Sequence, residues 1–428
     1  MDDATDVCSW LFNFTVTQGV NLMKHSLRLL VAILTLSQIG CFAPEQHFAI
    51  HSPEWEMANP PFEGRTTPEA QAEMAKRHRV IIAVLDGGFD YNHPFLRRNI
   101  HPFATPESSG RTYGVGFDTL GDDFFPHYTV VNIKTQEDLS LELDIQDHGT
   151  HVAGLAALKN PAIGILPVRV LPVWMTEEED QGSYSLRFAA KMAHRSVDMI
   201  ASGIDFAVAH GASILNMSLG MSIEGLHNND QATLLQHAAE VLAAPMSTRW
   251  KNALFIVAAG NDHLLLERHE QSLPATLNEP HVLAIGALKD HTTISYYSNY
   301  GRYVDLYVRG SDITSAVPLI QQSPGNRNKL SGSSMAAPLA AHAAAELKLI
   351  APELTGPELR ALLLNTADER TLAIEPLPDA SLKEPKISRK VRVLNFLKAK
   401  RAARHLTEAS TQEREKLLTA PFLHGHAE

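Results

Sequence analysis

Leu-Ser-Gly-Ser-Ser-Met-Ala-Ala-Pro, residues 330–338, is the stretch that decides how the rest of this chain is interpreted. It follows a polar loop at residues 324–329 and opens an alanine-rich run, residues 339–347, whose composition predicts a buried helix. Pro338 fits the first turn of that helix, where backbone N–H groups lack intrahelical partners. Ser334 is therefore expected at a helix N-terminus, beside free N–H donors. A serine in this position either caps the helix or, if a base takes its proton, attacks a carbonyl group.

Two further stretches carry the other groups that such chemistry needs. Residues 80–88, VIIAVLDGG, form an apolar run that ends at Asp86. This pattern is typical of a buried parallel strand with a carboxylate at its C-terminal end, where open α/β sheets keep their sites. Residues 147–158, DHGTHVAGLAAL, place His148 at the start of a helix of small residues. Along the chain the order is aspartate, histidine, Ser334.

Together the three stretches resemble the subtilisin-like serine peptidases, the subtilase family, whose catalytic triad follows the same order. Residues 148–154 match the family pattern HGTHVAG in full, and residues 332–338 match GTSMAxP with Ser333 for threonine. In the stretch around the aspartate, Gly87 stands where threonine or serine is usual. The resemblance implies an α/β fold with three αβα layers, a mostly parallel central sheet and a single catalytic domain.

The resemblance also implies a mechanism. Asp86 would orient His148, and His148 would take the proton of Ser334 as its hydroxyl attacks a peptide carbonyl. Asn261, at the end of an apolar run, matches the family's oxyanion-hole asparagine, whose amide is a neutral donor. The resemblance requires no cofactor for this chemistry and implies a protein or peptide substrate.

Substrate-binding residues follow from the same resemblance. Ser218, Leu219 and Gly220 match the family's segment that pairs with extended substrate backbone beside the S1 pocket. Gly260 is expected to line S1, and Ser272 is the candidate for its floor. Taken without the resemblance, Ser218 to Gly220 would be an ordinary strand-ending turn.

A structural calcium ion is not expected at the position that many relatives use. Phe95 stands where they have an aspartate that binds calcium, and hard cations need oxygen ligands. The clustered carboxylates around Asp122, in residues 116–123, could hold a metal, although a solvated acidic loop is the interpretation that the sequence favours, because no spaced calcium-loop pattern is present.

Composition sets the remaining limits. The chain has 428 residues, of which 44% are hydrophobic and 20% charged, as in an ordinary globular protein with a sizeable core. A net charge of −11 argues against nucleic acid as a partner. The chain contains only two cysteines, Cys8 and Cys41, so a disulfide framework is not expected. We expect a monomer.

The N-terminal residues 1–41 are interpreted as an extension followed by a signal peptide, with Met23 as an alternative start. Basic residues at 24–28 precede a short apolar segment, residues 29–36, and then Gly40 and Cys41. This order resembles a bacterial lipoprotein signal, with lipidation at Cys41, although glutamine replaces the usual leucine at residue 38. It implies export to the cell envelope with membrane attachment through Cys41. A plain secretory signal or a buried hydrophobic segment are the alternatives.

The rest of the chain divides into a linker at 42–76, the peptidase domain at 77–406 and a tail at 407–428. The linker is short for a folding pro-domain. Within the domain, we expect one long helix or two shorter ones at 189–210, further helices at 355–366 and 392–406, and a loop at 370–390. Two other functions stay open: a catalytically inactive binding protein of the same fold, and a narrow-specificity maturation protease or acyl-transfer enzyme.

Overall fold

The computed structural model describes most of the chain beyond residue 59. The described ranges are 60–64, 67–105, 111–128, 130–134, 141–145, 147–171, 186–223, 226, 228–268, 271–321, 323–378, 387–406 and 408–419. The predicted signal segment and Cys41 lie outside them. Within these ranges, each helix is too short or too polar to cross a membrane.

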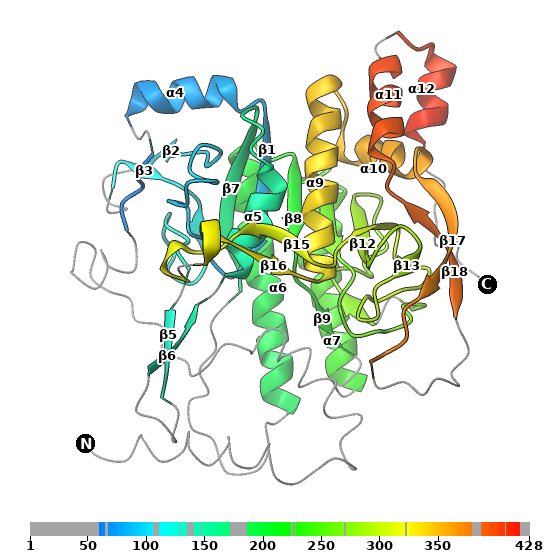
Figure 1. Ribbon diagram of the computed structural model, residues 1–428, viewed down its shortest axis with the longest axis horizontal. Helices are drawn as coiled ribbons and strands as arrows, with labels where there is room; N and C mark the ends of the chain where they lie inside the picture. The colour runs from blue at the N-terminus through cyan, green and yellow to red at the C-terminus, as the bar shows by residue number, and fades with distance from the viewer. Residues whose placement is uncertain are drawn as a thin grey trace.

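A ten-stranded sheet lies at the centre of the molecule, in the order β13-β17-β18-β14-β12-β10-β8-β1-β7-β4 (Figure 1). The strands from β4 to β14 in this order pair in parallel, whereas β17 pairs with β18, and β12 with β13, in antiparallel fashion. Their bounds are β1 (Val80–Asp86), β4 (Phe117–Asp118), β7 (Ile163–Arg169), β8 (Ile214–Met217), β10 (Leu254–Ala258), β12 (Val282–Leu288), β13 (Thr293–Ile294), β14 (Leu306–Arg309), β17 (Asp368–Ile374) and β18 (Ser388–Val393).

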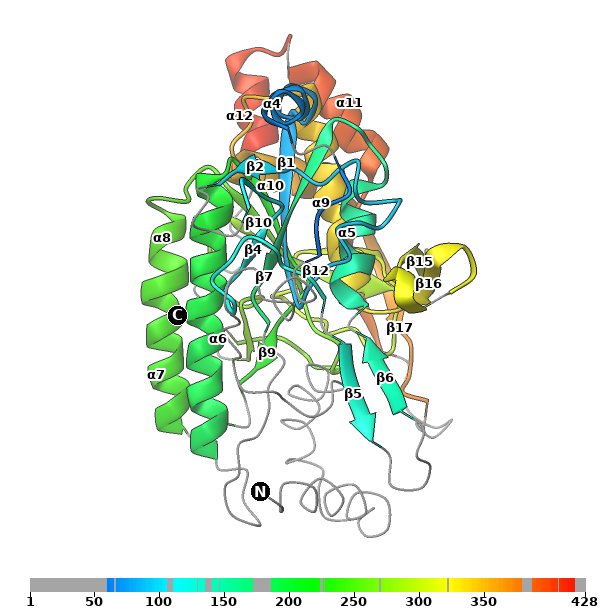
Figure 2. The ribbon, with the colours of Figure 1, turned by 90° about the vertical axis from the view of Figure 1, so that its left-hand side faces the viewer.

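Helices cover both faces of this sheet (Figure 2). One face carries α5 (His148–Ala157), α9 (Ser333–Ile350), α10 (Gly356–Asn365) and α11 (Phe396–Leu406), and the other carries α6 (Leu186–Ala209), α7 (Asn228–Ala238) and α8 (Ala244–Met246). Strand β1 shows why both faces are apolar. Its Ile82 and Val84 belong to the core under α5 and α9, while Ala83 and Leu85 belong to the core under α6 and α7. The three-layer αβα prediction is therefore confirmed.

Among the described residues, four two-stranded ribbons lie outside the main sheet. They are β2 (Phe103–Ala104) with β3 (Tyr113–Gly114), β5 (Val130–Lys134) with β6 (Leu141–Ile145), β9 (Met221–Ser222) with β11 (Ser272–Leu273), and β15 (Ile313–Ala316) with β16 (Arg327–Leu330). The hairpin of β5 and β6 directly precedes α5, and it accounts for part of the long interval between Asp86 and His148. The hairpin of β15 and β16 leads straight into α9.

Part of the segment predicted as a linker packs on the domain. Helix α4 (Pro68–Arg77) begins after Thr67, whose hydroxyl caps it by accepting from the N–H of Ala70. Before it, Phe62 is 5% exposed and meets Tyr91 edge to face. The hydroxyl of Tyr91 donates to the carbonyl of Pro60 at 2.6 Å. The contacts of Tyr91 with Phe62 and Pro60 thus fix residues 60–64 on the domain, although the sequence there shows little periodicity.

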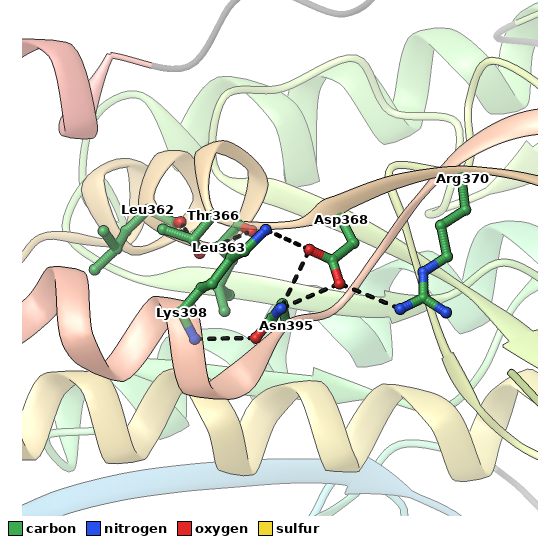
Figure 3. Close-up of polar contacts among 7 residues, drawn as sticks. All are labelled: Leu362, Leu363, Thr366, Asp368, Arg370, Asn395 and Lys398. Atoms are coloured by element: carbon green, nitrogen blue, oxygen red, sulfur yellow. Dashed lines mark hydrogen bonds and ion pairs between the residues drawn. The ribbon is translucent and has the colours of Figure 1, made fainter.

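The C-terminal expectations need correction. The loop predicted at 370–390 contains most of β17 and the start of β18, and α11 begins only at Phe396. Asp368 connects these elements: it accepts hydrogen bonds from Asn395, Lys398 and Arg370 (Figure 3). The bonds from Lys398 and Asn395 lower the pKa of Asp368 to about 2. Asp368 thus ties the start of β17 to the start of α11.

The segment predicted as a tail also contains structure. Helix α12 (Thr411–Leu418) starts at Ser410, which forms a capping box with Glu413. The amide of Asn365, at the end of α10, donates to the carbonyls of Leu417 and Thr419 at 2.9 and 3.2 Å. Residues 408–419 are thus attached to the α9 side of the domain.

Candidate active site

Asp86 ends β1 at the carboxyl edge of the parallel strands, and it is 1% exposed. Its Oδ1 accepts a hydrogen bond from the N–H of Gly87 at 2.7 Å, which fixes one side of the carboxylate. The first turn of α5 approaches it closely: a Cβ at Gly149 would lie 2.2 Å from the carbonyl oxygen of Gly88 and 3.2 Å from Asp86. Only glycine allows this contact, and the contact brings the start of α5 to the end of β1.

His148 is the first residue of α5, and its ring faces Asp86. Its Nδ1 lies 2.9 Å from both carboxylate oxygens. Burial alone would lower the pKa of His148, but the charge of Asp86, its hydrogen bond and the nearby Asp147 together raise it above the ordinary 6.5. The side chain is 40% exposed, so the far edge of the ring is accessible to a substrate. The arrangement fixes the tautomer and stabilises a positively charged ring.

Ser334 is the second residue of α9, as expected at a helix N-terminus. Its hydroxyl donates to the carbonyl oxygen of Ser218 at 3.3 Å, rather than to His148. Catalytic hydrogen bonds are often long or misaligned until substrate is bound, so this rotamer leaves His148 a candidate base. The structure therefore joins Asp86 and His148 directly and holds the serine hydroxyl against the segment predicted to bind substrate.

Pro338 does not lie in the first turn of α9, as the sequence led us to expect, because the helix begins at Ser333. As the sixth residue it removes the N–H that would bond to the carbonyl of Ser334 four residues earlier. The hydroxyl of Ser218 donates to that carbonyl instead, at 2.8 Å, and itself accepts from the amide of Asn216 at 3.0 Å. Pro338 thus leaves the carbonyl of Ser334 free to accept a hydrogen bond from Ser218, directly after β8.

Asn261 follows β10 and is held against the start of α9. Its Oδ1 accepts hydrogen bonds from the N–H and the hydroxyl of Ser333 at 2.8 and 2.9 Å. Ser333 is fully buried, and its hydroxyl also accepts from the N–H of Gly260 at 3.1 Å. With Oδ1 occupied, the Nδ2 group of Asn261 must point the other way. Among the described residues, neither this Nδ2 nor the N–H of Ser334 has a hydrogen-bond partner.

The predicted substrate-binding residues lie around this point. Leu219 is 6% exposed, and β9, directly after Gly220, pairs with Ser272 and Leu273 of β11. A Cβ at Gly220 would lie 3.4 Å from the carbonyl oxygen of Leu273 and 3.9 Å from the hydroxyl of Ser272. Gly260 has φ +103°, a conformation that glycine adopts readily. Four of the predicted residues are thus neighbours: Ser218, Leu219, Gly220 and Ser272. The N–H of Gly260 donates to the hydroxyl of Ser333, the residue directly before Ser334.

The position of Phe95 does not fit a calcium ion. The Nζ of Lys159 lies 3.9 Å from the centre of its ring, and the Cζ of Arg327 lies 4.0 Å from it. Two cations on an aromatic ring are favourable, but they repel a divalent cation. Within the described ranges, no group of three or more His, Cys, Asp or Glu side chains is placed to hold a metal ion.

The carboxylates near Asp122 form a different kind of cluster. Asp118 pairs with Arg169 at 3.0 Å, and Asp123 bridges Asp118 through the backbone. Burial, and next the charge of Asp118, raise the pKa of Asp123 to about 7. Asp123 is therefore partly protonated near neutral pH, whereas a calcium ligand must be a charged carboxylate.

Comparison with known proteins decides the family. The Subtilase family matches residues 77–393. The chain belongs to the subtilase family. A thermophilic serine proteinase of Bacillus sp. (strain AK1) is 29% identical over 300 residues, 67% of this chain and 56% of that protein. The cell wall-associated protease of Bacillus subtilis (strain 168) is 32% identical over 237 residues, 53% of this chain and 22% of that protein. The chain thus spans about half or less of the length of these relatives.

The fold comparison agrees with this subtilase assignment. The crystal structure of a lanthipeptide protease has a TM-score of 0.50 and 18% identity, over 77% of this chain and 90% of that chain. The family and fold predictions are therefore confirmed. Sequence reasoning missed Asn216 and Ser333 as partners of the site. Asn216 had one signal, a polar residue inside an apolar strand, whereas Ser333 lay within the matched motif.

Proposed function

We propose that this subtilase is a serine endopeptidase in which Asp86, His148 and Ser334 form the catalytic triad. The observation that carries the proposal is the contact of His148 Nδ1 with both oxygens of the buried Asp86, at 2.9 Å. A buried carboxylate that orients a half-exposed histidine beside a helix N-terminal serine is the arrangement that activates a hydroxyl nucleophile.

In the proposed mechanism, the Nε2 of His148 accepts the proton of Ser334 as the hydroxyl oxygen bonds to the peptide carbonyl carbon. Asp86 stabilises the resulting imidazolium. The negative oxygen of the tetrahedral intermediate lies against the Nδ2 group of Asn261 and the N–H of Ser334, which are both free donors. His148 then returns the proton to the leaving amine, and water hydrolyses the acyl-enzyme through the reverse steps.

The proposed substrate is an extended protein or peptide chain. Ser218, Leu219 and Gly220 would pair with its backbone, with Gly260 and Ser272 at the S1 pocket. The ribbon of β9 and β11 supports this placement, because it holds Ser272 beside Gly220. A substrate that adds as an extra β-strand is bound through its main-chain groups, whatever its sequence. The adjoining pocket then selects the substrate side chain.

The decisive experiment treats folded protein with a fluorophosphonate and locates the modified residue by mass spectrometry. We expect modification of Ser334 and loss of peptide hydrolysis in Ser334→Ala and His148→Ala, since triad members act as a unit. Asn261→Ala should lose about 10²–10³ in kcat, the loss known for such a donor in subtilisin and carried over by family membership. Folded protein whose Ser334 stays unmodified would instead be an inactive binding protein.

Product analysis separates hydrolysis from acyl transfer. With a competing amine present, a peptidase releases mainly carboxylic acid products, whereas an acyl-transfer enzyme forms new amides. Cleavage of many sites in a denatured proteome would support a general endopeptidase. Cleavage of a single site would identify a maturation protease.

We also propose the domain limits and location that the sequence predicts. Residues 77–406 would form the peptidase domain of a monomer, with 42–76 as the segment that joins it to Cys41 and 407–428 as an appendage. The name of the cell wall-associated relative is compatible with export. Lipidation of Cys41 would anchor the enzyme to the envelope, because two or more acyl chains hold a protein stably on a bilayer. Cys41→Ser should then release active enzyme into the soluble fraction. Intact mass of the membrane-bound form should show an acylated Cys41, and any other mature N-terminus would refute lipidation.

A further inference from the structure

Asn299 is a fully buried asparagine in the loop between β13 and β14. Within the part of the chain that the structure describes, its side chain makes hydrogen bonds to the segment 259–264 alone. The Oδ1 accepts from the N–H groups of Asp262 and Leu264 at 3.0 and 2.9 Å. The Nδ2 donates to the carbonyl of Ala259 at 2.9 Å and to the carboxylate of Asp262 at 3.3 Å.

These bonds use the whole hydrogen-bonding capacity of the amide, which has two N–H donors and two acceptor lone pairs. The backbone N–H of Asn299 adds a further bond to the carbonyl of Gly260, at 3.0 Å. All of them go to one short segment, and Asn261 lies in the middle of it. The path of the backbone on both sides of Asn261 is therefore set by Asn299.

This segment needs an outside partner to keep its shape. Gly260 has φ +103° and His263 has φ +56°, both in regions that L-residues avoid. Asn299 packs directly against the first of them, since a Cβ on Gly260 would lie 2.3 Å from its Nδ2. Without these contacts the segment would relax toward ordinary backbone angles, and Asn261 would move with it.

We propose that Asn299 is a positioning residue for catalysis, acting through Asn261. The inference rests on the proposed peptidase function. Ser333 fixes the side-chain amide of Asn261, and Asn299 fixes the backbone before and after it. Such a donor stabilises a transition state only when it is already in place, and a shift of about 1 Å in a reacting group costs about 10²-fold in rate.

The test is a double-mutant cycle of Asn299→Ala with Asn261→Ala, measured as kcat and KM on a peptide amide. Asn299→Ala should lower kcat by about 10–10² and change KM by less than about threefold, since the proposed oxyanion donor acts mainly in the transition state. In the Asn261→Ala protein, adding Asn299→Ala should cost less than about threefold more, because the group through which it acts is already absent.

Asn299→Asp supplies a second variant of equal size. It keeps both acceptor contacts with the loop N–H groups but places a charged oxygen against the carbonyl of Ala259 and the carboxylate of Asp262. Its kcat should fall at least about fivefold, as expected when two donors become repulsive contacts. If Asn299→Ala does not fold, Asn299→Asp takes its place in the cycle.

Asn99→Ala is the matched control. Asn99 is 3% exposed, and its amide donates to the carbonyls of Asn160 and Ile163 at 2.6 and 2.9 Å, away from the segment 259–264. This variant should lower Tm and leave kcat unchanged. Wild-type kcat in Asn299→Ala, or losses that simply add to those of Asn261→Ala, would overturn the inference while the peptidase function stands. Wild-type protein that neither cleaves peptide nor reacts with a fluorophosphonate would refute the function and this inference with it.

Discussion

His151 lies one helical turn beyond His148 in α5, and its ring is fully buried. Its Nε2 lies 2.9 Å from the carbonyl of Ile313 and 3.2 Å from that of Asn328, so it carries the proton and donates to both. Its Nδ1 is buried without a partner among the described residues. Burial, and more weakly the nearby His148, lower the pKa of His151 to about 4. The folded protein therefore holds this ring neutral.

This low pKa predicts acid lability with a defined size. A histidine whose pKa is lower in the folded state contributes stability that is present above the unfolded pKa of about 6.5 and is lost as pH falls toward 4. With a folded pKa of about 4, the linkage relation gives a loss of about 2 kcal/mol between pH 7 and 4.5 from His151 alone. That is a large part of a typical net stability of roughly 5–15 kcal/mol.

His151→Gln isolates this effect. The Nε2 of glutamine can donate to the same two carbonyls, but the amide takes no charge. Urea unfolding at pH 7 and 4.5 should be compared in the Ser334→Ala background, which prevents self-digestion. We expect the variant to be less stable at pH 7 and to lose about 2 kcal/mol less on acidification, since every other histidine is present in both proteins. A stability difference that stays constant with pH, to within about 0.5 kcal/mol, would refute the reasoning.

Three further predictions concern titration and metal. The rate constant kcat/KM should rise with pH around a midpoint above 6.5, because His148 must be neutral and its pKa is raised. Asp86→Asn should move that midpoint down. A wild-type midpoint below 6.5 would contradict the assignment of His148 as the base. A chelator should leave Tm unchanged, and a decrease in Tm with EDTA that calcium reverses would contradict this. Phe95→Leu should lower Tm by about 2–6 °C, because its two cation–π contacts are lost. The raised pKa of Asp123 means that its contribution to stability is complete below about pH 4 and is lost as pH rises through about 7. The Tm of Asp123→Asn minus that of the wild type should therefore increase as pH rises across that window, and a difference that stays constant with pH would contradict this.

Features carried by contiguous residues were predictable from the sequence. The apolar run before Asp86 is typical of a strand buried on both faces, and β1 is flanked by helices as that pattern predicts. His148 begins α5 and Ser334 lies in the first turn of α9, since both follow from runs of small residues that start there. The position of Pro338 within α9 was not predictable. Proline cannot donate to the carbonyl four residues earlier, so it is tolerated inside a helix when another residue donates to that carbonyl instead. Ser218, the residue directly after β8, does so here.

The C-terminal part shows a different limit. Strand β18, SRKVRV, is half charged, and neither its alternation nor its propensity predicts a strand. It forms by antiparallel pairing with β17, and across this pair the carboxylate of Glu369 lies 2.7 Å from the Nζ of Lys390. One local signal was present: Asn395 caps α11 by accepting from the N–H of Lys398 at 3.0 Å. An asparagine before an amphipathic run indicates a helix start at Phe396, rather than at Arg392.

The hairpin of β15 and β16 has the contacts needed to keep the three proposed catalytic groups in register. It continues covalently into Ser334. His151, on the helix of His148, donates to its backbone. Asp90, four residues beyond Asp86, accepts from the N–H of Leu319 in the loop between its two strands, at 3.0 Å. Each group lies on a separate element, and productive geometry tolerates errors of well under about 1 Å. The hairpin thus contacts the segments that carry all three groups, in addition to the shared core in which β1, α5 and α9 pack on one another.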